Sequence, residues 1–177
     1  MARSNKPPMK VSVGNGVQAG FTSGCFPMIV TPFVITFLTV LVVLGFPGFS
    51  PLPDLTPLVA FIAFVGPLDR ILITGLTCGA ACALVSGCAC WIINRLKDRS
   101  AQELMRNFAA IVASAIAAIG FGSVLFAAPG DISQSANGGS YTFEFPAWIV
   151  VALSIVVGVI AFIVVRDSIR ELRSSED

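Results

Sequence analysis

Four long apolar runs, separated by polar stretches, dominate the pattern of hydrophobic and polar positions along the chain. They cover residues 26–46, 71–93, 107–128 and 147–165. A helix rises about 1.5 Å per residue, so runs of about 20 residues cross a hydrocarbon core about 30 Å thick. The pattern predicts an all-α membrane protein whose four transmembrane helices form one domain over residues 26–165.

The segments at the two ends of the chain are polar. Glycine and proline are dense in residues 1–25, which predicts an irregular N-terminal segment and a first helix that starts near Phe26. Pro27 and Pro32 lie in the first turns of that helix, where Pro32 is expected to kink it or delay its entry. Residues 166–177 carry charges of both signs and are predicted to form a C-terminal tail.

A short extra apolar segment, residues 58–67, lies between the first and second spans. It is too short to cross a bilayer. Three placements stay open: at the outer surface, as a re-entrant half-helix, or packed on a neighbouring subunit. Asp69 and Arg70 follow it at the outer boundary, where a solvated ion pair is the ordinary interpretation. If residues 58–67 are re-entrant, the pair would lie at an outer vestibule and influence ion entry.

Basic residues are distributed unevenly between the two sides that these spans define. With the N-terminus inside, 10 of the 11 lysines and arginines lie on the inner side and Arg70 alone lies outside. Positive charge in short loops is retained in the cytoplasm. The count predicts that both termini are cytoplasmic and that the membrane is a cell or inner membrane.

Ser100 and Glu103 have the spacing of a capping box, which predicts that the third helix starts near Ala101.

Small residues recur at every fourth position in the second and third spans. Such rows let helices approach closely in lipid, where van der Waals contact drives association. The two rows either pack against each other inside one bundle, or one of them receives a partner subunit or another copy of the chain. The predicted helix-packing residues are Gly75, Gly79, Ala83, Gly87, Ala110, Ser114, Ala118 and Gly122.

Composition limits the chemistry that the chain can perform. Charged residues make up 12% of the chain, the net charge is +1 and histidine is absent. The low net charge argues against a nucleic-acid partner. The absence of histidine removes the commonest general base and metal ligand. Cys78 and Cys82 share a helix face, but Cys88 and Cys90 point elsewhere, so one metal ion would not gather all four. We expect no metal, no cofactor and thiols that act as small fillers, with acylation of Cys88 and Cys90 as an alternative.

No apolar run contains an ionisable residue in its middle, whereas proton-coupled and charged-substrate transporters usually need one. The sequence predicts a non-enzymatic multi-pass membrane subunit that packs with other membrane proteins and stabilises a larger complex. The alternative is a small homo-oligomeric channel or holin-like pore. Its lining would come from the hydroxyl-bearing residues of the spans, which are Thr36, Thr39, Thr77, Ser86, Ser114 and Ser154.

Overall fold

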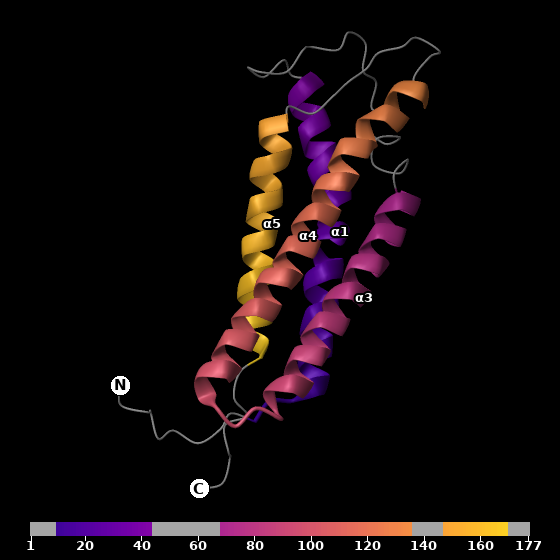
Figure 1. Cartoon of the computed structure of the whole chain (residues 1–177). Helices are drawn as coiled ribbons and strands as arrows, with labels where there is room; N and C mark the ends of the chain where they lie inside the picture. The colour runs from indigo at the N-terminus through magenta and orange to yellow at the C-terminus, as the bar shows by residue number, and fades with distance from the viewer. Residues whose placement is uncertain (1–9, 44–67, 136–146, 170–177) are drawn as a thin grey trace, which may run out of the picture.

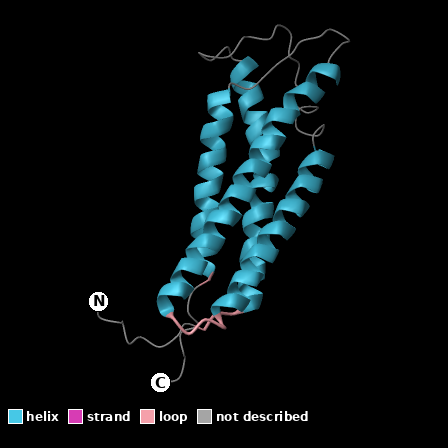
Figure 2. Cartoon of the chain, viewed as in Figure 1, coloured by secondary structure: helices cyan, strands magenta, loops and turns pink. Residues whose placement is uncertain are grey.

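The structure is a computed structural model that describes residues 10–43, 68–135 and 147–169. It contains the helices α1 (Val13–Val43), α3 (Leu68–Ile93), α4 (Arg99–Ser135) and α5 (Ala147–Ser168). The helices lie side by side and alternate in direction along the chain (Figure 1). All regular secondary structure in the described ranges is helical (Figure 2).

Each of these four helices contains a stretch that is long and apolar enough to cross a membrane. This confirms the predicted all-α architecture and fits an integral membrane protein. The extra segment, residues 58–67, lies outside the described residues. Residues 1–9 and 170–177 also lie outside the described residues. Helix α5 continues to Ser168, so it includes the first residues of the predicted C-terminal tail.

The helices pack chiefly as α1 with α3, α3 with α4, and α4 with α5. Two apolar clusters fill the bundle, one toward each end. The first centres on residues of α3, α4 and α5 that include Cys82, Cys90 and Ala113. The second centres on α1 and α4, where Met28 and Phe121 are buried. Large apolar side chains also cover the outside of the helices, as expected for surfaces that face lipid.

Helix α1 begins at Val13, so the prediction of an irregular segment up to residue 25 was wrong. The glycines that suggested irregularity occur at Gly16, Gly20 and Gly24, one turn apart, and all three are buried. Glycine lowers helix propensity by about 1 kcal/mol per residue, but tertiary packing overrides such preferences. In lipid a row of glycines on one face is itself a packing surface.

The two prolines of α1 lie inside the helix. Proline removes a backbone donor and strains the helix. The hydroxyl of Thr31 donates to the Pro27 carbonyl at 2.9 Å, and that of Thr36 donates to the Pro32 carbonyl at 2.8 Å. These bonds keep both hydroxyls satisfied within their own helix, which suits an apolar environment.

The N-terminal cap of α4 differs from the predicted one. Helix α4 starts at Arg99, and the carboxylate of Asp98 accepts a hydrogen bond from the backbone N–H of Ser100 at 3.1 Å. Asp98 is therefore the capping residue and Ser100 lies in the first turn, so the capping box was wrong. Glu103 instead pairs with Arg99 at 3.8 Å. At its other end α4 reaches Ser135, beyond the apolar run that was predicted to end at residue 128.

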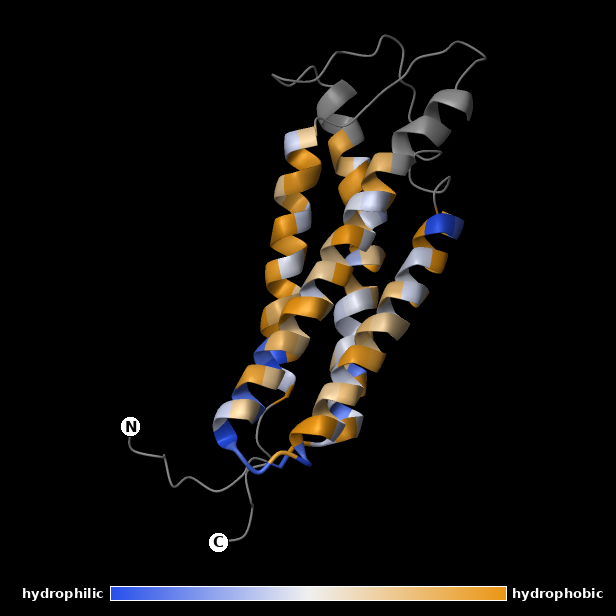
Figure 3. Ribbon diagram, viewed as in Figure 1, coloured by the Kyte–Doolittle hydropathy of each residue, from blue (hydrophilic) through white to orange (hydrophobic). Residues whose placement is uncertain are grey.

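Most basic residues of the bundle lie at one end. There α1 and α4 begin and α3 and α5 end (Figure 1). Of the seven lysines and arginines in the described ranges, six lie at this end and Arg70 lies at the start of α3, at the other end. The hydrophilic colouring at the α3–α4 connection and the apolar helix bodies follow the same division (Figure 3). Below, this end is called the basic end.

Candidate functional site

Helices α1 and α3 meet with their backbones in direct contact. A Cβ atom on Gly24 would lie 2.7 Å from the Cys78 carbonyl oxygen and 2.7 Å from the Cα of Gly79. A Cβ atom on Gly20 would lie 2.7 Å from the Ser86 hydroxyl oxygen. Ordinary contacts of Cβ atoms are 3.4–4 Å long, so these positions accept no side chain without a shift. The interface depends on α1 having glycine there.

The predicted small-residue row of α3 is the other half of this interface. A Cβ atom on Gly75 would lie 3.0 Å from the Cβ of Met28, and one on Gly87 would lie 2.8 Å from a methyl group of Val17. Gly79 faces the thiol of Cys25, and Ala83 is buried on the same helix. The row on α3 is thus covered by α1 of the same chain.

The predicted row on α4 packs elsewhere. Ala110 is buried in the cluster at the basic end. A Cβ atom on Gly122 would lie 2.9 Å from the hydroxyl oxygen of Ser154, and one on Gly158 would lie 3.3 Å from the Cβ of Ala118 and 3.5 Å from the Ser114 carbonyl oxygen.

The two predicted rows therefore do not meet each other as one interpretation expected. The α3 row packs on α1, and the α4 row packs mainly on α5. Because a row of small residues permits close approach to any suitable surface, it carries no information about its partner. The row that sequence reasoning missed, on α1, has a signal of the same kind: glycine at every fourth position from Gly16.

Cysteine thiols connect neighbouring helices. The thiol of Cys25 donates to the Gly75 carbonyl at 3.2 Å, and the thiol of Cys82 donates to the Ala113 carbonyl at 3.5 Å. Cys90 is fully buried beneath Gly16, whereas Cys88 is exposed. Burial makes Cys90 inaccessible to an acylating enzyme in this conformation. Among the described residues, no group of three or more histidine, cysteine, aspartate and glutamate side chains is placed to hold a metal ion.

At the basic end, the side-chain amides of Asn94 and Gln102 form hydrogen bonds with the backbone near the helix ends. The side chain of Asn94 donates to the Val11 carbonyl and accepts from the Val11 N–H, both at 2.9 Å. Gln102 is buried and its amide donates to the Ile93 carbonyl at 3.0 Å and to the Leu96 carbonyl at 2.8 Å. Because buried polar groups need partners, these bonds define the start of α1 and the turn into α4.

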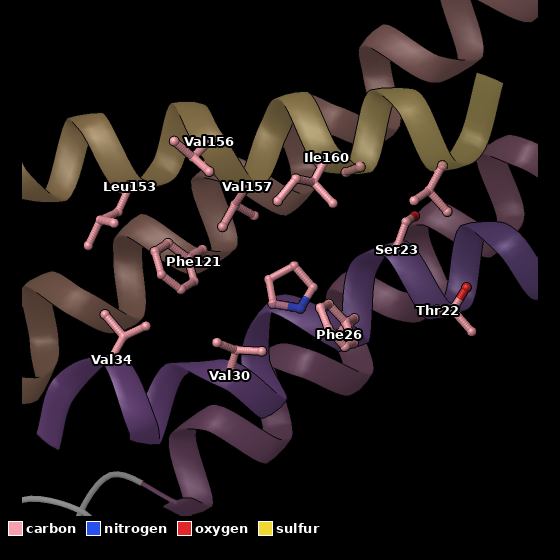
Figure 4. Close-up of a pocket in the computed structure, with 13 residues that line it drawn as sticks. Thr22, Ser23, Phe26, Val30, Val34, Phe121, Leu153, Val156, Val157 and Ile160 are labelled. Carbon is pink, nitrogen blue, oxygen red and sulfur yellow. The ribbon is translucent and has the colours of Figure 1, made fainter. Parts of the chain in front are cut away.

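An apolar groove lies between α1 and α5 (Figure 4). Its volume is about 470 Å³, and its walls are almost entirely hydrocarbon. Phe121 of α4 contributes to the lining between the two helices, and Val34 and Leu153 lie at one end (Figure 4). The lining residues are Thr22, Ser23, Phe26, Pro27, Val30, Val34, Phe121, Leu153, Val156, Val157, Ile160, Ala161 and Val164.

The polar atoms of the groove lie at its other end, on Thr22 and Ser23 (Figure 4). The hydroxyl of Thr22 donates to the Gln18 carbonyl at 3.0 Å, and that of Ser23 donates to the Gly20 carbonyl at 2.9 Å. Each hydroxyl has one proton, so its remaining hydrogen-bonding capacity is as an acceptor. This end of the groove therefore presents acceptors.

Within one chain, the described side chains among the residues proposed for a pore or a vestibule have different surroundings. Thr77 is exposed and donates to the Ile73 carbonyl at 2.9 Å, whereas Ser86 is buried and Ser114 donates to the Ile111 carbonyl at 2.9 Å. Asp69 and Arg70 are both exposed in the first turn of α3. The segment that would form a vestibule with them, residues 58–67, lies outside the described residues.

Comparison with family models, with curated proteins and with solved structures finds no match for this chain.

Proposed function

We propose that the chain is a non-enzymatic multi-pass membrane subunit that packs with another membrane protein and stabilises a larger complex. Both termini and the basic end would face the cytoplasm, because positive charge is retained on that side. The guanidinium of Arg95 lies 3.9 Å from the centroid of the Trp91 ring, which supports a position of this end at a membrane surface, where tryptophan is enriched.

The observation that carries the proposal is the outer face of α5, which we define as Trp148, Val151, Ile155, Val159 and Ile163. All five side chains are at least half exposed. The most apolar stretch of α5 is 28% buried, compared with 50% for α4. Valine and isoleucine keep one side-chain rotamer in a helix, so their ordering in an interface costs little entropy. The face is a rigid, continuous apolar surface.

The size of these side chains favours an unlike partner over a second copy. Close packing in lipid needs small residues on at least one of the two helices. The outer face of α5 offers large ones, and the small-residue rows of α3 and α4 are already covered by α1 and α5. A transmembrane helix of another protein that carries its own small residues would complement the face. A pore of identical copies has less support, because the hydroxyl-bearing residues point to different surroundings.

A pair of photo-crosslinking residues tests the proposal in the native membrane. A photoreactive amino acid is placed at Val159, on the outer face of α5, or at Ile119, which is also apolar and exposed but lies on α4. We expect a discrete adduct with an unlike membrane protein from position 159 and no such adduct from position 119. Adducts that consist of two copies of the chain would overturn the proposal, and so would equal adducts from both positions or none from position 159.

A further inference from the structure

The side-chain carboxamide of Gln18 on α1 has no partner in the part of the bundle that the structure describes. Gln18 is exposed, and it lies within the stretch of α1, Val13–Leu38, that is long and apolar enough to cross a membrane. Beyond the hydrogen bonds of the helix backbone, the one bond described at this residue joins the Thr22 hydroxyl to the Gln18 backbone carbonyl at 3.0 Å. The side-chain N–H groups and oxygen of Gln18 are therefore left to the surroundings of the bundle.

The contacts between α1 and α3 fix the level of Gln18 along the bundle. A Cβ atom on Gly16 would lie 3.3 Å from the Ser86 carbonyl oxygen. A Cβ atom on Gly20 would lie 2.7 Å from the Cys82 carbonyl carbon. Gln18 is midway between the two glycines, so it is level with the middle of the α3 segment from Cys82 to Ser86.

This level lies inside the hydrocarbon. The middle of the α3 segment is Leu84, seven residues before Trp91. Seven residues of helix rise about 10 Å. Because tryptophan is enriched at membrane surfaces, Gln18 lies about 10 Å inside the surface at the basic end. Water is absent at this depth, so polar side chains there form hydrogen bonds with neighbouring helices.

The side chain of Gln18 projects from a side of α1 that the described part of the bundle leaves uncovered. Successive residues of a helix are rotated by about 100°, which places Asn15, Gln18, Thr22 and Ile29 within one strip about 60° wide. All four residues are exposed. The glycines that pack on α3 lie on the opposite side of α1. We call this strip the outward face of α1.

A second copy of the chain satisfies the carboxamide of Gln18. Two copies with the same orientation in the membrane are related by an axis along the membrane normal, so each residue near the axis faces its own counterpart. A carboxamide has both donors and an acceptor, so it pairs with another carboxamide through two reciprocal bonds. The outward face carries no charge that would repel its counterpart. Threonine, present at Thr22, is one of the small residue types that permit close approach of helices.

We infer that two copies of the chain associate through the outward face of α1, with the carboxamide of Gln18 in one copy bonded to that of Gln18 in the other. The inference does not rest on the proposed function, because the outer face of α5 is a different surface and stays free for an unlike partner.

Energy transfer between copies in liposomes tests the inference. The full chain, tagged at its C-terminus with a donor or an acceptor fluorescent protein, is reconstituted in phosphatidylcholine, and the lipid-to-protein ratio is varied. No other protein is present, so transfer above that of random mixing measures association of the chain with itself. We expect a saturable dimer. Transfer equal to random mixing at every ratio would overturn the inference.

Two matched substitutions on the outward face separate the carboxamide from the surface around it. Gln18→Met keeps the length of the side chain and removes its polar group. We expect it to weaken dimerisation about tenfold, which equals 1.4 kcal/mol shared between two hydrogen bonds. Thr22→Val also removes a polar group, but the Thr22 hydroxyl is bonded within its own helix, so dimerisation should not change. Equal effects of the two substitutions, or none from Gln18→Met, would overturn the inference.

A mixed pair tests whether the two carboxamides bond to each other. Donor-tagged wild type is combined with acceptor-tagged Gln18→Met. Because reciprocal bonds need both carboxamides, the mixed pair should associate at least as weakly as two copies of Gln18→Met. If each Gln18 instead bonded to another group of the second copy, the mixed pair would show half of the effect in free energy, and the pairing of the carboxamides would be refuted.

Photo-crosslinking in the same liposomes locates the contact. A photoreactive amino acid is placed at Ile29, on the outward face of α1, or at Ile111, which is apolar and exposed on α4. We expect adducts of two copies from position 29 and none from position 111. Equal adducts from both positions, or none from position 29, would overturn the assignment of the dimer to α1.

Discussion

The contact between α1 and α3 at Gly20 predicts a change of sign between two glycine substitutions on one helix. Gly20→Ala adds a methyl group 2.7 Å from the Ser86 hydroxyl oxygen and 2.7 Å from the carbonyl carbon of Cys82. Gly14→Ala is the control, because the nearest atom to its new methyl group is the Ser12 hydroxyl oxygen at 3.8 Å. Both changes make the same chemical replacement in α1.

The magnitude follows from the distances at Gly20. Moving from 2.7 Å to the ordinary minimum of 3.4 Å requires the helices to separate locally by about 0.7 Å. A gap of about 0.5–1 Å removes a quarter to a half of the dispersion energy of the atoms involved. Overpacking costs about 1–3 kcal/mol, while the higher helix propensity of alanine offsets about 1 kcal/mol. We expect Gly20→Ala to lower the free energy of unfolding by up to about 2 kcal/mol.

At Gly14 the same propensity gain stands without a steric penalty, so Gly14→Ala should raise the free energy of unfolding by about 1 kcal/mol. Reversible unfolding in mixed micelles, followed by circular dichroism as a denaturing detergent is added, measures both values. If the two variants change stability in the same direction and within about 0.5 kcal/mol of each other, the backbone contact at Gly20 does not hold the helices together.

The remaining predictions concern the connections at the basic end. Asn94→Ala removes two hydrogen bonds to the backbone before α1. It should lower the free energy of unfolding by about 1–3 kcal/mol and speed amide exchange in the first turn of α1; unchanged exchange there would contradict the role of Asn94. Asp98→Ala removes the cap of α4 and should cost about 1 kcal/mol. Ser100→Ala, in the first turn, should change stability by less than about 0.5 kcal/mol. If Ser100→Ala lowered the free energy of unfolding more than Asp98→Ala in the same assay, Ser100 and not Asp98 would be the capping residue of α4.

The apolar runs were sufficient to predict the four helices, because the thickness of the hydrocarbon core dictates the length of a run. The last residue of α3 and the first residue of α5 lie where the runs predicted. The start of α1 was missed because glycine was interpreted as a helix breaker. In lipid the same glycines form a packing face when they recur at every fourth position, so their spacing carries more information than their number.

The partners of the small-residue rows and the groove were beyond what the sequence predicts. A row of small residues permits close approach and leaves open which helix approaches. The groove lies between α1 and α5, with Phe121 of α4 in its lining, while α5 packs closely on α4 through Gly122 and Gly158. Such an empty space depends on how three helices are placed together, and no single residue pattern encodes it.

The glycine row of α1 ends one turn after Gly24 at Met28, whose side chain lies against Gly75. If α1 slid one turn toward the basic end, Met28 would enter the site of Gly24, where not even a single methyl group fits. Sliding in the opposite direction would pull Val11 away from Asn94. The clash in one direction and the loss of hydrogen bonds in the other therefore fix the position of α1 along the axis of α3.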